Sequence, residues 1–119
     1  MTTRLRVTCA LVVLALPLAA AAAPAHAKSP PKGKYGCTIG GSQFAGNLFI
    51  LANNRYRVNR SRRGRYRNLA GNKMRFPTGV YKGLYRGFWH RTDDGGVEIE
   101  LTSIESGFTS TYCILEKRG

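Results

Sequence analysis

The chain has 119 residues, of which 19 are lysine or arginine and 6 are aspartate or glutamate, giving a formal net charge of +13. This length leaves room for a single domain, and the excess of positive charge predicts attraction of anions at some cost in self-repulsion. The sequence contains neither a glycine-rich phosphate-binding loop nor a nucleophile elbow. The common nucleotide-binding and hydrolase motifs are therefore excluded, and no catalytic residue is assigned.

Residues 1–27 are predicted to form a cleavable signal peptide. Arg4 and Arg6 supply a positive N-terminal region, residues 7–16 are almost purely apolar, and an Ala-His-Ala triplet ending at Ala27 suits signal peptidase. The alternative is an uncleaved membrane anchor, but a span needs about 20 strongly apolar residues, and this run is diluted by alanine and broken by proline. We therefore expect an exported protein, periplasmic or secreted, with no transmembrane anchor after cleavage.

The predicted mature chain keeps 17 basic and 6 acidic residues, a net charge of +11. Its first residues, 28–33 (KSPPKG), are predicted to form a flexible tether, because they include two adjacent prolines and no other apolar side chain to bury. Residues 34–119 form the predicted domain. Cys37 and Cys113 lie near its two ends, and an even pair of cysteines in a small exported domain predicts a disulfide. The alternative is a pair of free, buried thiols.

Alternation of apolar and polar residues between turn signals predicts an all-β domain. Strands are expected at about residues 35–39, 47–52, 55–59, 65–67, 73–76, 97–101 and 109–115, whereas residues 80–91 are less regular. Asn53 and Asn54 suit a two-residue hairpin turn, because asparagine tolerates positive φ. The pattern predicts a single antiparallel barrel or sandwich of seven or eight strands, closed by one disulfide. In a closed up-and-down barrel the first and last strands are neighbours, as that disulfide requires.

A recurring pattern of glycine, tyrosine and cysteine runs through the mature chain. It comprises the opening Gly33, Tyr35 and Cys37, the later Gly64 and Tyr66, and the closing Cys113. In this pattern the chain resembles small exported bacterial β-barrel proteins of avidin-like or lysozyme-inhibitor-like size. The resemblance implies a disulfide-closed barrel. It rests on strands, glycines and cysteines alone, and therefore implies no binding or catalytic residue.

A cluster of seven arginines within 13 residues is the main candidate for a binding site. Its members are Arg55, Arg57, Arg60, Arg62, Arg63, Arg65 and Arg67. If residues 55–59 and 65–69 pair as a hairpin, four of these arginines share one sheet face and three lie at its tip, and Lys73 and Arg75 could extend the patch. Like charges across paired strands are destabilising, and arginine binds phosphate and carboxylate through two hydrogen bonds. The cluster therefore predicts anion binding. The alternatives are a solubilising edge and internal balance by Glu98 and Glu100.

The aromatic segment around Tyr85 and Trp89 is a second candidate, since aromatic and basic residues together can stack on bases or sugars. The alternative is that these rings fill the core of a small barrel. His90 is the only histidine left after cleavage, so no metal site and no cofactor are predicted. Glu98 and Glu100 would lie about 7 Å apart along a strand, a separation that inverting glycosidases use, although such an exposed pair is typical of ordinary surface.

Together these features predict a non-enzymatic, exported binding module for an anionic partner, either an envelope glycan, a lipid headgroup or extracellular nucleic acid. A protein-interaction or inhibitor domain that docks on an acidic exported protein is the first alternative. A small hydrolase is the second.

Overall fold

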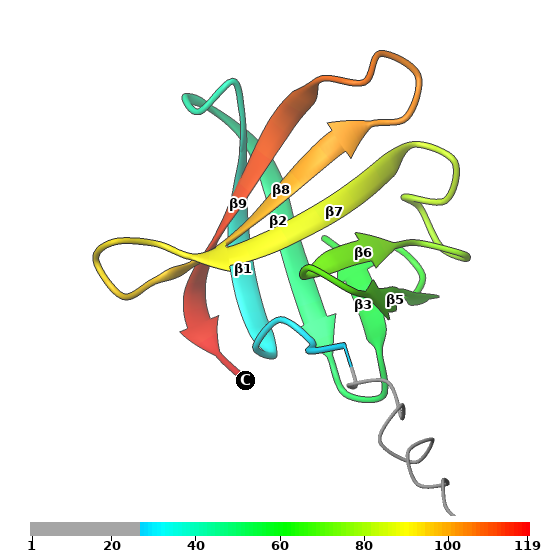
Figure 1. Ribbon diagram of the computed structural model, residues 1–119, viewed down its shortest axis with the longest axis horizontal. Helices are drawn as coiled ribbons and strands as arrows, with labels where there is room; N and C mark the ends of the chain where they lie inside the picture. Colours follow the sequence, from blue (N-terminus) through cyan, green and yellow to red (C-terminus); the bar gives the residue numbers. More distant parts are fainter. Residues whose placement is uncertain (1–26) are drawn as a thin grey trace, which may run out of the picture.

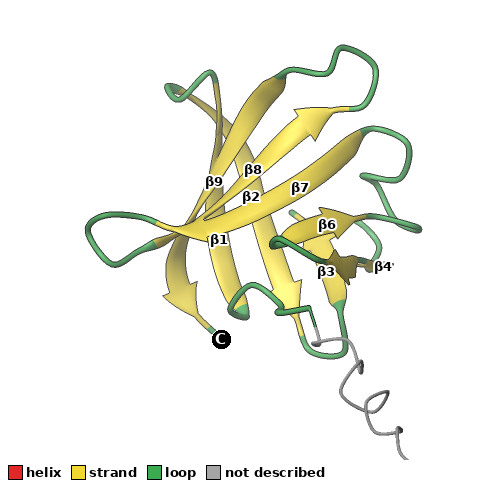
Figure 2. Ribbon diagram, in the orientation of Figure 1, coloured by secondary structure: helices red, strands yellow, loops and turns green. Residues whose placement is uncertain are grey.

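The computed structural model describes residues 27–119, so the predicted signal peptide, apart from its last residue, lies outside the described residues. The described part consists of strands and loops (Figure 2). None of it forms a helix long and apolar enough to cross a membrane. The nine strands are β1 (Gly33–Ile39), β2 (Gln43–Leu51), β3 (Arg55–Val58), β4 (Gly64–Arg65), β5 (Arg67–Leu69), β6 (Lys73–Arg75), β7 (Tyr85–Arg91), β8 (Val97–Ser103) and β9 (Thr109–Arg118).

The strands form one antiparallel, nearly closed barrel (Figure 1). Their order is β4-β3-β2-β1-β9-β8-β7-β6-β5, so the first strand of the chain pairs with the last. The two edge strands, β4 and β5, are separated in sequence only by Tyr66, whose backbone N–H donates to the carbonyl of Asn54 (2.9 Å). This short crossing explains why nine strands are found where the sequence predicts seven or eight. It also favours the barrel over the sandwich.

The disulfide between Cys37 and Cys113 is confirmed. The two residues face each other in the β1–β9 ladder with their Cα atoms 3.9 Å apart. Both are buried, at 2% and 0% exposure, so the bond closes the seam of the barrel from the inside. Its loop spans a sequence separation of 76 residues.

Aromatic side chains fill much of the interior. Tyr56 stacks on Tyr81 with ring centroids 5.4 Å apart, and Phe76 meets both rings edge-on. Burial raises the pKa of the Tyr56 and Tyr81 hydroxyls, so both groups stay neutral. The buried hydrophobic core comprises Tyr35, Cys37, Leu48, Ile50, Tyr56, Tyr66, Met74, Phe76, Tyr81, Trp89, Val97, Ile99, Leu101 and Cys113.

The segment before β1 runs across one end of the barrel, which we call the capped end (Figure 1). The sequence predicts a flexible tether here, but Pro30 is fully buried. The indole N–H of Trp89 donates to the carbonyl of Lys28 (3.4 Å), and the amide of Asn68 donates to the Ser29 hydroxyl (2.6 Å). The segment therefore contacts β7 and β5 at once.

The local turn predictions can be compared directly with the backbone. Asn53 and Asn54 both have positive φ, at 60° and 56°, as predicted, but Leu51 pairs with Arg55, so the loop has three residues, 52–54, and not the predicted two. Residues 85–91, by contrast, form a regular strand where the sequence suggests irregularity. The alternation is obscured there because the inward position 87 is glycine and the outward position 88 is phenylalanine, 40% exposed.

Candidate functional site

The predicted pairing of residues 55–59 with 65–69 is wrong beyond Arg65. Strand β3 pairs with β4 through Arg55↔Arg65 and Tyr56↔Gly64 only. Residue 66 crosses the end of β3, and Arg67 then lies on β5, where it pairs with Arg75 of β6. The reason is barrel closure, because this one stretch of chain has to form a strand pair on each of its two sides.

The observed strand pairing spreads the basic surface over more strands than predicted. Two arginine pairs, Arg55 with Arg65 and Arg67 with Arg75, face each other directly across strands. Arg86 on β7 lies one position beyond the Met74↔Gly87 pair and is exposed, as Arg67 and Arg75 are. We call these outward residues the arginine wall, which consists of Arg55, Arg57, Arg65, Arg67, Arg75 and Arg86. The remaining predicted residues, Arg60, Arg62 and Arg63, are exposed in the loop between β3 and β4.

Arg57 is the least exposed member of the wall. It faces Phe49 across the β2–β3 ladder, and its guanidinium carbon lies 4.7 Å from the centre of that ring. This contact fixes the guanidinium plane by a cation–π interaction. The Nε atom of Arg57 is buried and has no hydrogen-bond partner among the described residues.

The acidic residues of the chain all lie elsewhere. Residues 28–92 contain fifteen lysines and arginines and no acid, whereas residues 93–119 contain all six acids and two basic residues. Glu116 pairs with Lys34 (3.8 Å), and Glu98 and Glu100 pair with His90 (2.9 Å each). No arginine of the described part forms an ion pair, so Glu98 and Glu100 do not balance the wall as the alternative hypothesis required.

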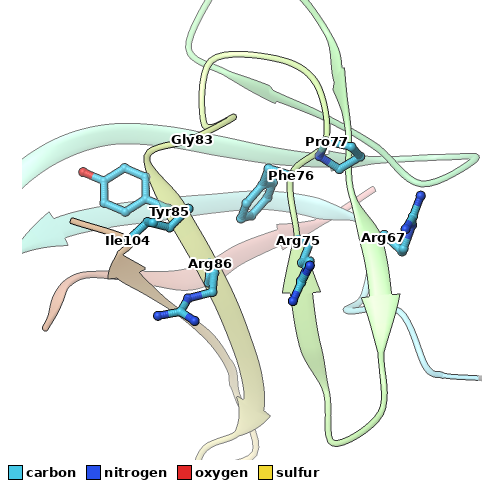
Figure 3. A pocket seen from close by; sticks show the side chains of 8 residues that line it. All are labelled: Arg67, Arg75, Phe76, Pro77, Gly83, Tyr85, Arg86 and Ile104. Carbon is cyan, nitrogen blue, oxygen red and sulfur yellow. The ribbon is translucent and has the colours of Figure 1, made fainter. Parts of the chain in front are cut away.

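A pocket of about 450 Å³ opens at one part of the wall, where β6 and β7 separate beyond their short ladder. In Figure 3, Arg75 and Arg86 extend in the same direction from neighbouring strands, whereas Arg67 extends the other way. Arg75 and Arg86 both line this pocket. The lining residues are Arg67, Arg75, Phe76, Pro77, Gly83, Tyr85, Arg86 and Ile104.

The loop beside this pocket is anchored by a buried tyrosine. The Tyr56 hydroxyl donates to the carbonyl of Thr78 (2.9 Å) and accepts from the backbone N–H of Tyr81 (2.9 Å). Glycine is needed at position 79, because φ is +93° and a Cβ there would lie 2.5 Å from the Tyr56 hydroxyl. The loop therefore holds the pocket rim in place through a contact to the barrel interior.

The predicted aromatic platform is not present as a pair. Trp89 is 6% exposed and belongs to the core. Tyr85 is half-buried, meets Tyr81 edge-on at 5.1 Å and lines the pocket. Arg86 is the member of the arginine wall on β7, and it lies outside the arginine cluster predicted from the sequence. Its signal was the alternation in residues 85–91, which Phe88 obscured.

A second charged group lies on the outer face of β7 and β8. The Nε2 atom of His90 is 2.9 Å from a carboxylate oxygen of both Glu98 and Glu100, and Nδ1 is 3.2 Å from the carbonyl of Arg91. Burial alone would lower the His90 pKa, but the hydrogen bonds to Arg91, Glu98 and Glu100 outweigh it and raise the pKa above 6.5. These three side chains are also of types that zinc accepts. As described, they form an ion-paired cluster.

The chain matches no protein-family model, no curated protein and no solved structure. The candidate site is therefore interpreted from its own geometry and charge.

Proposed function

We propose that this protein is a non-enzymatic binding module for an anionic partner and that the arginine wall is its binding surface. The observation that carries the proposal is the strand register, which places Arg55 opposite Arg65 and Arg67 opposite Arg75, with no ion pair to an acid among the described residues. Like charges placed directly opposite are destabilising. A bound anion removes this repulsion and takes up guanidinium donors that the protein leaves free.

Two further features support the wall as a binding surface. The buried Nε of Arg57 has no partner within residues 27–119, and an unpaired buried donor costs about 1–3 kcal/mol. Arg75 and Arg86 extend together at the mouth of a pocket whose apolar lining includes Phe76 and Ile104. The wall thus offers both an extended cationic strip for a polymer and one place where a single phosphate or carboxylate can be held by two guanidinium groups.

We also propose that the protein acts outside the cytoplasm after cleavage following Ala27. The Lys28 carbonyl accepts a hydrogen bond from the Trp89 indole, so cleavage after Ala27 would retain this contact. Intact-mass analysis of protein produced from the full chain should give a species that begins at Lys28. A species that retains Met1 would contradict this proposal.

The wall is tested by direct binding to a phosphate polymer, a sulfated glycan and a single-stranded oligonucleotide, with a neutral dextran for comparison. Replacing Arg57, Arg65 and Arg67 by serine should weaken polyanion binding by about tenfold or more while the fold is retained. The matched control replaces Lys32, Lys117 and Arg118 by serine. It removes the same amount of positive charge from exposed positions near the capped end. Equal losses in both variants would show that net charge, rather than the wall, is responsible.

A further inference from the structure

The two ends of the barrel expose different kinds of residue. We call the end opposite the N-terminal segment the uncapped end, and the β1–β2 and β8–β9 loops rise from it in Figure 1. In an up-and-down barrel the loops alternate between ends, which assigns four loops to it, residues 40–42, 59–63, 76–84 and 104–108. The turns of the capped end are residues 52–54, 70–72 and 92–96.

Large apolar side chains are exposed around the uncapped end. Phe108 is 75% exposed and Phe44 is 65% exposed. The turns of the capped end contain only alanine, glycine, asparagine, threonine and aspartate. Soluble monomers rarely leave clustered apolar side chains in water without a binding role. The exposed set at this end is Ile39, Phe44, Val80, Leu84, Ile104 and Phe108.

Backbone hydrogen bonds hold these loops to one another and to the barrel. The N–H of Ile104 donates to the carbonyl of Leu84 (3.0 Å), which joins the β8–β9 loop to the β6–β7 loop. The N–H of Gly40 donates to the carbonyl of Ser110 (2.9 Å), which joins the β1–β2 turn to β9. The apolar tips are therefore presented from fixed positions around one rim.

The same rim is strongly basic. Arg60, Arg62 and Arg63 are exposed in the β3–β4 loop, and Lys82 is exposed in the β6–β7 loop. The only acid in the four loops is Glu105. A partner for this end must therefore combine negative charge with an apolar phase that can accept phenyl and aliphatic side chains.

This combination decides between the possible occupants. A second copy docked end to end would bring one basic rim, with Arg60, Arg62 and Arg63, against another, because a two-fold interface uses the same patch of both copies. A polysaccharide offers charge but no apolar phase, and a nucleic acid offers flat bases that suit aromatic rings but not Ile39 or Ile104. An anionic lipid surface supplies both, since its headgroups attract basic residues and its acyl boundary receives apolar tips.

We propose that the uncapped end docks on an anionic lipid surface, with Phe44 and Phe108 entering the acyl boundary and the β3–β4 loop arginines contacting headgroup phosphates. This inference rests on the proposed function, because it names lipid as the anionic partner. It extends that function by assigning the apolar rim a role that the arginine wall does not provide.

The test measures co-sedimentation with vesicles of phosphatidylcholine alone and of phosphatidylcholine mixed with phosphatidylglycerol. Wild-type protein should bind only the mixed vesicles, and Phe44→Ser with Phe108→Ser should weaken that binding by about tenfold or more. The control, Phe88→Ser, removes one exposed ring from the barrel wall and should bind like wild type, whereas Phe108→Ser alone should already weaken binding. Binding of soluble polyphosphate should be the same in all four proteins.

A spectroscopic readout checks insertion itself. Phe108→Trp places an indole at the most exposed tip, whereas the native Trp89 is buried and should not respond. The fluorescence emission of the indole introduced at position 108 should shift to the blue with the mixed vesicles only.

The remaining outcomes separate the two proposals. Unchanged vesicle binding by the double variant, with polyphosphate binding intact, would overturn lipid docking and leave the proposed function standing. Failure of wild type to bind either vesicles or polyphosphate would overturn both. A wild-type dimer that the double variant converts to monomer, without loss of vesicle binding, would assign the rim to self-association instead.

Discussion

Two walls of the same barrel differ in whether their charged side chains are paired. On the outer face of β3 to β6, arginines face arginines across strands, and no acid is within ion-pairing distance. On the outer face of β7 and β8, Glu98 and Glu100 converge on His90. Strand alternation is the same on both walls, so the fold does not impose the difference. The unpaired charge of one wall is therefore a feature that can serve binding, and the following experiments break or sharpen this contrast.

The largest effect on stability should come from removing the disulfide that closes the barrel. The Cys37–Cys113 bond joins β1 to β9 and closes a loop with a sequence separation of 76 residues. Replacing both cysteines by alanine should lower the free energy of unfolding by about 4–5 kcal/mol, according to chain-entropy arguments. Denaturant unfolding of the variant and the parent measures this directly. A difference below about 1 kcal/mol would show that the ladder holds the seam without the bond.

Reversing one charge on each wall should change the free energy of unfolding by a smaller amount. The change should be stabilising on the arginine wall and destabilising on the wall of β7 and β8. Arg75→Glu places a carboxylate opposite Arg67 and should stabilise the fold by about 0.2–1 kcal/mol. Glu100→Arg removes one partner of His90 and should destabilise the fold by a similar amount. Thermal melts at low and high salt test both variants, because the two effects should shrink together as salt rises. If Arg75→Glu destabilised the fold, this would contradict the proposed repulsion between Arg67 and Arg75.

The smallest effect should be the pH dependence of the His90 cluster. Its hydrogen-bond acceptors raise the His90 pKa above 6.5 in the fold, so the folded state binds the proton more tightly than the unfolded chain. The stabilisation is therefore fully present below pH of about 6.5 and is lost as pH rises through the higher folded value. Because an exposed ion pair contributes about 1 kcal/mol or less, we expect Tm to fall by a few degrees at most across this interval. The fall should be absent in His90→Gln, and an equal fall in that variant would exclude His90 as its cause.

Much of the fold was predictable from short patterns. Alternation identified Tyr35 and Cys37 as inward residues, and the two cysteines predicted the closing seam. The turn at Asn53 and Asn54 followed from the tolerance of asparagine for positive φ. These features depend on neighbours in sequence, or on a pairing that only two cysteines can make.

The candidate site was predictable only in part, because it depends on which strands meet. Seven clustered arginines were visible in the sequence, but the transfer of Arg67 to a pair with Arg75 follows from barrel closure at Tyr66. Arg86 joins the wall through the short β6–β7 ladder. The burial of Pro30 likewise needs the closed barrel end, which no local pattern in residues 28–33 reveals.

The salt dependence of polyanion binding tests the arginine wall most directly. Affinity for a single-stranded oligonucleotide should fall steeply with salt, by about 0.7 in log–log slope for each phosphate contact. Replacing Arg57, Arg65 and Arg67 by serine should reduce the steepness of that slope by roughly 2. Replacing Lys32, Lys117 and Arg118 should leave the slope nearly unchanged, although it removes the same charge. Equal slopes for the wild type and the wall variant, or equal losses in both variants, would contradict the account.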